Sequence, residues 1–409
     1  MGAGEGVQVG DGLAVGPDLV GAAEVATGQA LAALGVVPDL VVFFVCPGAG
    51  AAAPVEEVEA AGLRVMELAA PGATIGTTAH GVMADGRGVE GEPAVAVWAA
   101  SLPGTRVRTI FPVAERRPGA GPDGRDAIGV RGLVPPAEDD RVAVLLADPF
   151  AFPVSGVLDR LASTSPGFPV IGGLASGPGG PGANRLFAGG TVHHGGAVGV
   201  LLGGTSDARV VVSQGCRPIG PPMVVTRAEQ NRIAELAGRP AAERLREIVT
   251  ALPPEEQQQA LTGLHLGVAV DEYAESHDRG DFLVRAVLAV DVGDGAVIAG
   301  DVVEIGTTVR FQVRDAAGAA QDLHELLAPV RHAAPAAGAL LFSCNGRGAG
   351  MFGDADHDVH AVRVGLDPHA GGSGDAAGPR VAGFFAAGEI GPVGPGNHLH
   401  AFTASVLVV

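Results

Sequence analysis

The chain has 409 residues, a formal net charge of −19 and an apolar fraction of 47%. This length fits two domains of ordinary size, and the apolar fraction supplies enough side chains for buried cores. The negative charge argues against nucleic acid and anionic membrane surfaces, since both are bound by clustered basic side chains. All 26 basic residues are arginine, which excludes a P-loop and Schiff-base or pyridoxal chemistry, because these need a lysine.

The cellular compartment is indicated by the cysteines and by the absence of targeting patterns. Cys46, Cys216 and Cys344 are odd in number and have no C-x-x-C spacing, which fits a reducing compartment. Residues 1–15 have neither a basic region nor an apolar region of a signal peptide. No apolar run reaches membrane-spanning length. We therefore expect a cytoplasmic protein without membrane insertion.

The first half of the chain shows alternating helix and strand patterns. Residues 1–16 show neither, and we expect a disordered or loosely ordered tail there. The apolar spacing predicts helices at 18–34, 55–61 and 154–161, and strands at 40–45, 94–99, 142–147, 170–172, 197–202 and 208–213.

A break is expected at the proline-rich segment 218–224, where Thr226 and Glu229 then form a capping-box pattern. We place the domain boundary there, giving domains 17–222 and 223–409. The second half is predicted to hold helices at 227–237, 241–251 and 319–327, and strands at 264–270, 282–290, 308–313, 340–343, 361–364, 381–386 and 402–408. Strands outnumber helices and often follow one another directly. This predicts an α+β class, with two domains of mixed, largely antiparallel sheets and helices packed on them.

Two glycine-rich segments resemble each other. Gly167-Phe168 is followed by Gly172 and a Gly-Pro loop, as Gly383-Phe384 is followed by Gly388 and a Gly-Pro loop. One interpretation is that the two halves share a core topology about a pseudo-twofold axis. Chance similarity in a glycine-rich chain is the other.

The densest group of candidate functional residues follows the strand at 340–343. It consists of Cys344, Asn345, Gly346, Arg347 and Gly348. Glycines let backbone N–H groups line a concavity, and the planar guanidinium of Arg347 suits a carboxylate or phosphate. Alternatively, Arg347 forms a salt bridge to an acidic neighbour such as Glu389. Cys344 is either a reactive thiol beside Arg347 or a buried structural cysteine.

A second group lies in the loop after the strand at 381–386, where Glu389 is followed by Asn397, His398 and His400. A buried carboxylate needs a partner, and Arg347 is the partner we predict for Glu389. Together with Cys344, Glu389 and His400 would allow thiol or acid–base chemistry.

Potential metal ligands gather near the same region: Asp354, Asp356, His357, Asp358 and His360, with His398 and His400. Such a cluster on a glycine-rich loop is more often solvated, so we predict no metal. In the first half, Asp148 ends a strand and is expected to stabilise a turn. The loop after Gly172 lacks the G-x-G-x-x-G order of a dinucleotide site, and no cofactor is predicted.

These residues carry a resemblance to a known family. The first half is similar to the FIST N-terminal domain through the runs Gly76-Thr77-Thr78, Leu146-Ala147-Asp148-Pro149-Phe150, Gly172-Gly173-Leu174-Ala175-Ser176 and Gly195-Gly196-Ala197-Val198-Gly199. The second half resembles the FIST C-terminal domain through Gly215-Cys216-Arg217-Pro218, Phe282-Leu283-Val284-Arg285, Phe342-Ser343-Cys344 with Gly346-Arg347-Gly348, and Gly388-Glu389-Ile390-Gly391-Pro392. The resemblance implies a sensory module that binds small ligands such as amino acids and has no established catalytic activity. A separate signalling protein would read the signal.

We therefore expect a cytoplasmic sensor whose pocket lies at or between the domains and holds an anionic group, such as an amino-acid carboxylate. The predicted ligand contacts are Cys344, Asn345, Gly346, Arg347, Gly348, Glu389, Asn397 and His400. The alternative is an enzyme that uses Cys344 with Glu389 or His400, and a third hypothesis is an interaction scaffold.

Overall fold

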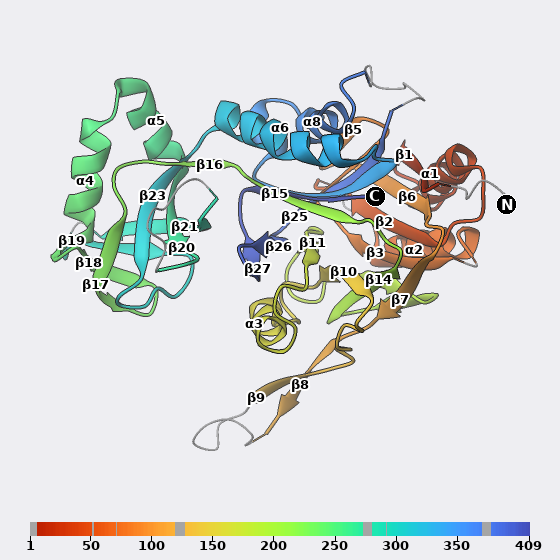
Figure 1. Ribbon diagram of the computed structural model, residues 1–409, viewed down its shortest axis with the longest axis horizontal. Coiled ribbons are helices and arrows are strands. Elements are labelled where there is room, and N and C mark those ends of the chain that lie inside the picture. The colour runs from red at the N-terminus through yellow and green to blue at the C-terminus, as the bar shows by residue number, and fades with distance from the viewer. Residues whose placement is uncertain are drawn as a thin grey trace. The chain divides into compact units, whose positions relative to one another are not determined.

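The computed structural model describes residues 6–50, 53–70, 72–118, 127–272, 280–291, 293–369 and 378–409 (Figure 1). Mixed and antiparallel sheets with helices packed on them confirm the predicted α+β class. The chain forms two compact units: unit 1 holds 1–212, 323–399 and 404–409, and unit 2 holds 213–322 and 400–403. The boundaries of these compact units differ from the boundary at 222/223 that the sequence predicts. The division into domains 17–222 and 223–409 stays a prediction.

Unit 1 is built from three repeats of one topology. The first repeat contains β1 (Gln8–Val15), α1 (Leu19–Leu34), β2 (Leu40–Pro47), α2 (Val55–Leu68), β3 (Ala73–Thr78), β4 (Gly81–Ala84), β5 (Arg87–Glu90) and β6 (Pro93–Ser101). The second contains β7 (Thr105–Ile110), β8 (Val113–Arg117), β9 (Ala127–Arg131), β10 (Asp140–Ala147), α3 (Val154–Thr164), β11 (Val170–Leu174), β12 (Leu186–Ala188), β13 (Thr191–His193) and β14 (Ala197–Gly204). The third contains β15 (Arg209–Gln214), α6 (Ala316–Ala333), β24 (Gly338–Cys344), α7 (Gly348–Phe352), α8 (His357–Leu366), β25 (Arg380–Ala386), β26 (Glu389–Val393), β27 (Gly396–His400) and β28 (Thr403–Val408).

In each repeat a helix connects two parallel strands, and a hairpin then leaves for a different sheet. The parallel pairs are β2 with β3, β10 with β11, and β24 with β25. The hairpin β4–β5 joins the sheet of the third repeat, β12–β13 joins that of the first, and β26–β27 joins that of the second. Each sheet is thus completed by a hairpin from another repeat. The sequence echo had suggested a twofold relation between halves, whereas the structure shows three repeats within unit 1.

The inner faces of the three sheets share one core, which includes Trp98, Leu146 and Phe342. The outer faces are covered by helices: α1 and α2 on the first sheet, α3 on the second, and α6 and α8 on the third. Burial on both faces explains the continuous apolar runs of the central strands. No helix in the described ranges combines the length and apolar character needed to cross a bilayer.

The predicted tail at 1–16 is wrong for residues 8–15, which form β1 and pair with β6 along their whole length; residues 1–5 lie outside the described residues. The sequence patterns did not predict this strand because glycine takes the place of apolar residues in it. A Cβ at Gly10 would lie 2.0 Å from Ala30 O of α1, so only glycine lets the helix pack this closely.

Two other predicted elements are wrong. The predicted helix 227–237 is a hairpin of β17 (Met223–Glu229) and β18 (Arg232–Leu236), in which the hydroxyl of Thr226 accepts a hydrogen bond from Gly238 N instead of capping a helix. The predicted strand 361–364 lies within α8, where Val359 and Val362 face the core on one side of the helix.

Unit 2 is a closed antiparallel barrel with two helices. Its elements are β16 (Cys216–Pro218), β17, β18, β19 (Arg239–Pro240), α4 (Ala241–Ala251), α5 (Pro254–Gly263), β20 (Leu264–Ala269), β21 (Phe282–Asp291), β22 (Ala296–Ala299) and β23 (Thr308–Arg314). The order β23-β17-β18-β22-β21-β20 closes because β20 also pairs with β23. Leu245 of α4 and Ala260 of α5 share a core with Leu266 and Phe311 of the barrel.

Candidate functional site

The predicted segment 344–348 forms a tight turn between β24 and α7. The turn is closed by a hydrogen bond from Arg347 N to Cys344 O at 2.9 Å. Gly348 has a φ of +29°, and a Cβ there would lie 2.4 Å from Oε1 of Glu90. The other oxygen of Glu90 accepts a hydrogen bond from Ala349 N at 2.9 Å. Glycine at 348 therefore lets β5 of the first repeat approach the start of α7.

Arg347 is fully buried and forms a bidentate ion pair with Asp358 of α8. Its Nε donates to Oδ2 at 2.7 Å and its Nη2 donates to Oδ1 at 2.9 Å. Asp358 also accepts a hydrogen bond from Ser343 Oγ at 2.6 Å and contacts His357 Nδ1 at 3.0 Å. This pair fixes α8 against the end of β24.

The ring of Phe352 completes this arrangement. It stacks on His357 with ring centroids 3.5 Å apart, and Cζ of Arg347 lies 5.2 Å from its centroid. We call Ser343, Arg347, Phe352, His357 and Asp358 the Arg347 cluster.

The electrostatics of the Arg347 cluster favour the charged forms. Burial alone would raise the pKa of Asp358, but the charge of Arg347 and the hydrogen bonds to His357, Arg347 and Ser343 hold it well below its usual range. Burial alone would lower the pKa of Arg347, yet the opposing charge of Asp358 raises it. The negative charges of Cys344, when ionised, and Glu389 act in the same direction to a smaller extent. Both members of the pair thus stay ionised at neutral pH.

The structure brings Cys344, Arg347 and Glu389 together in unit 1, but the bidentate partner of Arg347 is Asp358. Sequence reasoning placed Asp358 among possible metal ligands and assigned Glu389 to Arg347. Glu389 is fully buried at the start of β26, where it pairs with Gly173 of β11. Helical spacing could have revealed Asp358 only if 357–366 had been recognised as a helix.

The remaining predicted residues have varied surroundings. Cys344 is buried, with Sγ 3.9 Å from Oδ1 of the exposed Asn345. Asn397 accepts a hydrogen bond from Val170 N at 2.7 Å and donates one to Phe168 O at 2.8 Å, so its amide holds β27 against the start of β11. His400 is the last residue of β27 and lies where the chain passes from unit 1 to unit 2, whereas Cys344 and Glu389 lie within unit 1. Within the described ranges no three His, Cys, Asp or Glu side chains form a group able to hold a metal ion.

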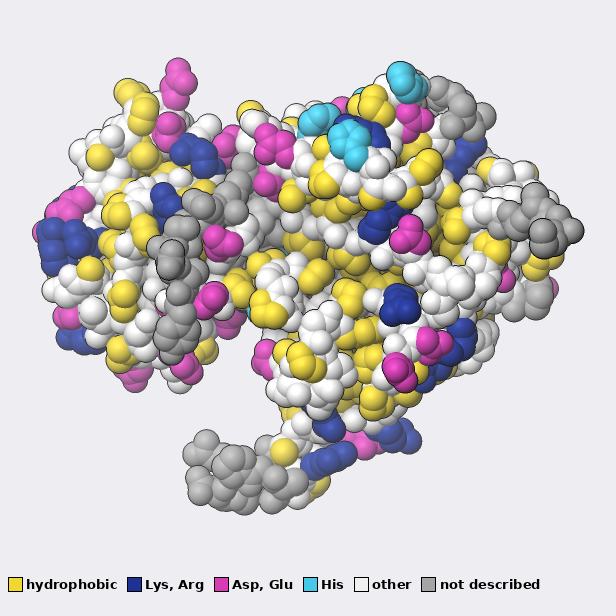
Figure 2. Space-filling model, in the orientation of Figure 1, with side chains coloured by type: hydrophobic (Ala, Val, Ile, Leu, Met, Phe, Trp, Pro, Cys, Tyr) yellow, Lys and Arg dark blue, Asp and Glu magenta, His cyan; other side chains and the backbone are white. Residues whose placement is uncertain are grey.

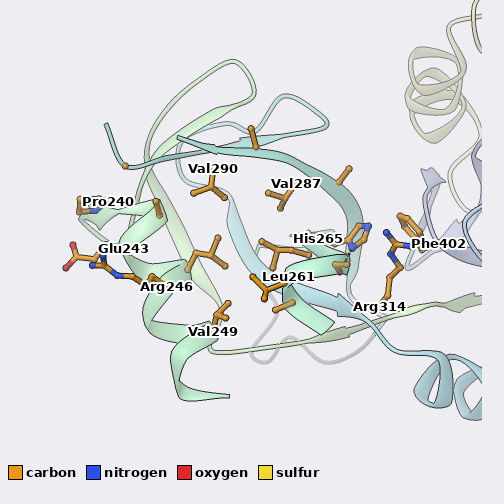
Figure 3. A pocket seen from close by; sticks show the side chains of 18 residues that line it. Pro240, Glu243, Arg246, Val249, Leu261, His265, Val287, Val290, Arg314 and Phe402 are labelled. Atoms are coloured by element: carbon orange, nitrogen blue, oxygen red, sulfur yellow. Dashed lines mark hydrogen bonds between the residues drawn. The ribbon is translucent and has the colours of Figure 1, made fainter. Parts of the chain in front are cut away.

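Sequence reasoning missed a large pocket that lies entirely within unit 2 (Figure 3). Its volume is about 840 Å³. Most of its wall is apolar and comes from α4, α5, β20 and β21: Leu245, Val249, Ala260, Leu261, Leu264, Ala286, Val287, Ala289 and Val290. A space of this size, with few polar groups, is typical of small-molecule sites.

The pocket forms because β21 is longer than its neighbour β20. The pairing with β20 runs only from Phe282 to Ala286, and Val287 to Asp291 pair with β22 on the other side. Beyond Ala286, no strand of the described chain pairs with the β20 side of β21, and side chains of α4 and α5 line the pocket together with this part of the strand. The apolar run Ala286-Val287-Leu288-Ala289-Val290, which does not alternate as a half-buried strand should, is the sequence signal for this site.

One end of the pocket carries Arg314, His265 and Phe402 (Figure 3). Cζ of Arg314 lies 4.9 Å from the ring centroid of Phe402, and the rings of His265 and Phe402 meet edge to face at 4.3 Å. His265 Nδ1 lies 2.8 Å from Gly263 O. Burial, more than the nearby charge of Arg314, lowers the pKa of His265 to about 4. His265 is therefore neutral at pH 7, donates from Nδ1, and leaves Arg314 as the cation at this end.

Comparison with known proteins gives one consistent result. A family model of the FIST N domain matches residues 39–239, and a model of the FIST C domain matches residues 241–392. An uncharacterised protein of Mycobacterium tuberculosis is 45% identical over 344 residues, covering 82% of this chain and 83% of the relative. An uncharacterised protein of Mycobacterium bovis is 40% identical over 407 residues, or 98% of each chain.

Proposed function

The chain belongs to the FIST family, and from this membership we propose that it senses a small molecule in the cytoplasm and signals to a separate protein. FIST domains are sensory domains of signal transduction. The proposed ligand is an amino acid or a similar anionic metabolite. The negative charge of the chain and the mixing of arginine with acidic side chains on the face in Figure 2 favour such a ligand over nucleic acid.

The observation that carries this proposal is the pocket of unit 2. Its volume and mainly apolar wall suit a molecule that is enclosed on several sides, and Arg314 and His265 supply a few polar groups that can orient it. A ligand with both a charged group and an apolar part fits this lining, because the apolar wall can bury the apolar part and Arg314 lies at one end.

The Arg347 cluster is a less suitable receptor for an anion. The side chain of Arg347 is fully buried, and two of the guanidinium nitrogens already bind Asp358 as a bidentate pair. We propose that this cluster holds α7 and α8 on the third sheet. The turn at 344–348 is the alternative site for ligand contact, because Asn345 in this turn is exposed.

The test is calorimetric titration of the full chain with amino acids and small carboxylates. Ala289→Trp places an indole in the pocket and should abolish binding, while Leu288→Trp is the matched control, because Leu288 is 62% exposed on the same strand and does not line the pocket. Asn345→Ala should leave binding unchanged. If Asn345→Ala removed binding and Ala289→Trp did not, the ligand would belong to the turn at 344–348.

The enzyme hypothesis, in which Cys344 acts with Glu389 or His400, stays a prediction. The burial of Cys344 argues against a reactive thiol, because catalytic cysteines need access to substrate.

A further inference from the structure

We propose that the pocket of unit 2 binds its ligand through an alkyl chain, and that the polar head of this ligand stays in water, so that its charge contributes little to the affinity. The inference rests on the proposed function and adds which part of the ligand supplies the affinity. An anionic metabolite with an alkyl chain would bind here through that chain.

The extended form of the pocket follows from β21. The pairing of β21 with β22 shifts its register between Val287 and Ala289. Every residue from Ala286 to Val290 except Leu288 lines the pocket, whereas a regular strand would turn only alternate residues toward it. This stretch of strand is about 13 Å long. The lining continues past it to the ring of Phe402 at one end (Figure 3).

The wall is aliphatic, which favours an alkyl chain over a flat aromatic ligand. Small residues such as Ala260 and Ala289 leave the space open, and the side chains of Leu261 and Val290 cover it with methyl groups. Within the described lining, the rings of His265 and Phe402 lie together at one end, so a flat ligand would find no ring to stack on along the rest of the wall. An alkyl chain needs only apolar surface, which it removes from water.

The charged side chains at the pocket interact within the protein or lie in water. Glu243 accepts a hydrogen bond from Arg239 Nη2 at 2.8 Å. The guanidinium of Arg314 packs over the ring of Phe402, with Cζ 4.9 Å from the centroid. Arg246 is exposed. None of these charges needs a charge on the ligand to compensate it, so we assign the affinity to the burial of apolar surface.

The polar head is placed in water because the pocket wall itself reaches the solvent. Leu261 of α5 is 76% exposed and Val290 of β21 is 37% exposed, although both line the pocket. A chain lying against them would cover large apolar side chains that the unliganded protein leaves in contact with water. The head group at the end of this chain keeps its hydration, whatever its charge.

The first experiment is calorimetric titration of the full chain at pH 7.5 with hexanol, octanol and decanol. We expect saturable binding at one site, with an affinity that rises about tenfold for each two methylene groups added. Decanoate and decyltrimethylammonium, whose heads carry opposite charges, should bind within threefold of decanol. An affinity that does not change along the alcohol series would overturn the alkyl chain. A tenfold preference for either charged head would overturn the hydrated head.

Two leucine variants test the location of the chain. Leu261→Ser should weaken decanol at least threefold, because Leu261 lines the pocket. Leu288→Ser is the matched control and should leave the affinity unchanged, since Leu288 is also exposed but lies outside the lining. Both side chains are exposed, so both variants should fold. Equal effects of the two substitutions would overturn the assignment to this pocket.

The outcomes separate this inference from the proposed function. Binding of amino acids or small carboxylates without binding of the alcohols would overturn the alkyl chain and leave the proposed function standing. If none of these compounds bound, the proposed function would fail as well.

Discussion

Removing Arg347 should destabilise unit 1 strongly, because it would leave the carboxylate of Asp358 buried without its cation. Asp358 is 1% exposed and, among the described residues, would keep the contacts to Ser343 and His357. Breaking a buried pair from one side costs about 3–5 kcal/mol of the free energy of unfolding. We expect this loss for Arg347→Met. The double variant Arg347→Met/Asp358→Leu should recover most of it, since no charge is then left buried.

The assay is urea unfolding followed by tryptophan fluorescence. Trp98 is the single tryptophan and lies in the core of unit 1, so its emission reports unfolding of that unit. A loss of 3–5 kcal/mol should lower the urea midpoint by roughly 1–2 M. If Arg347→Met lost less than about 1 kcal/mol, or if the double variant were as unstable as the sum of the single variants, the pair would not be the electrostatic unit that its geometry indicates.

Three further predictions concern a histidine, a thiol and the glycines. The pKa of His265 is about 4 in the folded chain and about 6.5 unfolded, so between these pH values the unfolded state binds one more proton than the folded state. The free energy of unfolding of unit 2 should therefore fall by about 3 kcal/mol from pH 7 to pH 4. Hydrogen exchange of the unit 2 amides should show this dependence on pH, and His265→Asn should remove most of it. Cys344 should react with iodoacetamide at least tenfold more slowly than free cysteine at pH 8 in a mass-spectrometric time course, whereas a faster reaction would revive the thiol-enzyme hypothesis. Gly28→Ala on the exposed face of α1 should raise the free energy of unfolding by about 0.5–1 kcal/mol, while Gly172→Ala, whose Cβ would lie 1.9 Å from Leu145 O, should fail to give soluble folded protein on expression.

The sequence allowed the fold class and most central strands to be predicted, because runs such as 40–45 and 142–147 are apolar throughout. It failed where glycine replaces apolar side chains: β1 contains Gly10 and Gly12, which α1 covers at close range. It also failed where one pattern fits two structures, as for β17 and β18, whose strands are short and partly polar. In both cases the structure of the segment depends on the element that packs against it or pairs with it, and a local sequence pattern does not identify that element.

The candidate site was predicted in part. The segment 344–348 and Glu389 do come together. The segment follows β24, Glu389 follows β25, and these two strands are parallel neighbours in one sheet. The pairing of Arg347 with Glu389 stays a prediction. The bidentate partner Asp358 was not identified from the sequence, because it becomes a neighbour of Arg347 only through the turn of α7 and α8. The pocket of unit 2 depends on where β20 stops beside β21, which is a property of strand register and not of any motif.

The exchange of hairpins between repeats has a consequence for synthesis and for truncation. β26 and β27 near the C-terminus complete the sheet of the second repeat, and β25 and β28 complete that of the third. A chain shortened before residue 380 would leave two of the three sheets with exposed edges, which are prone to aggregation. Nascent unit 1 therefore cannot reach its native state until its last strand leaves the ribosome, and no single repeat is a separable fragment for expression.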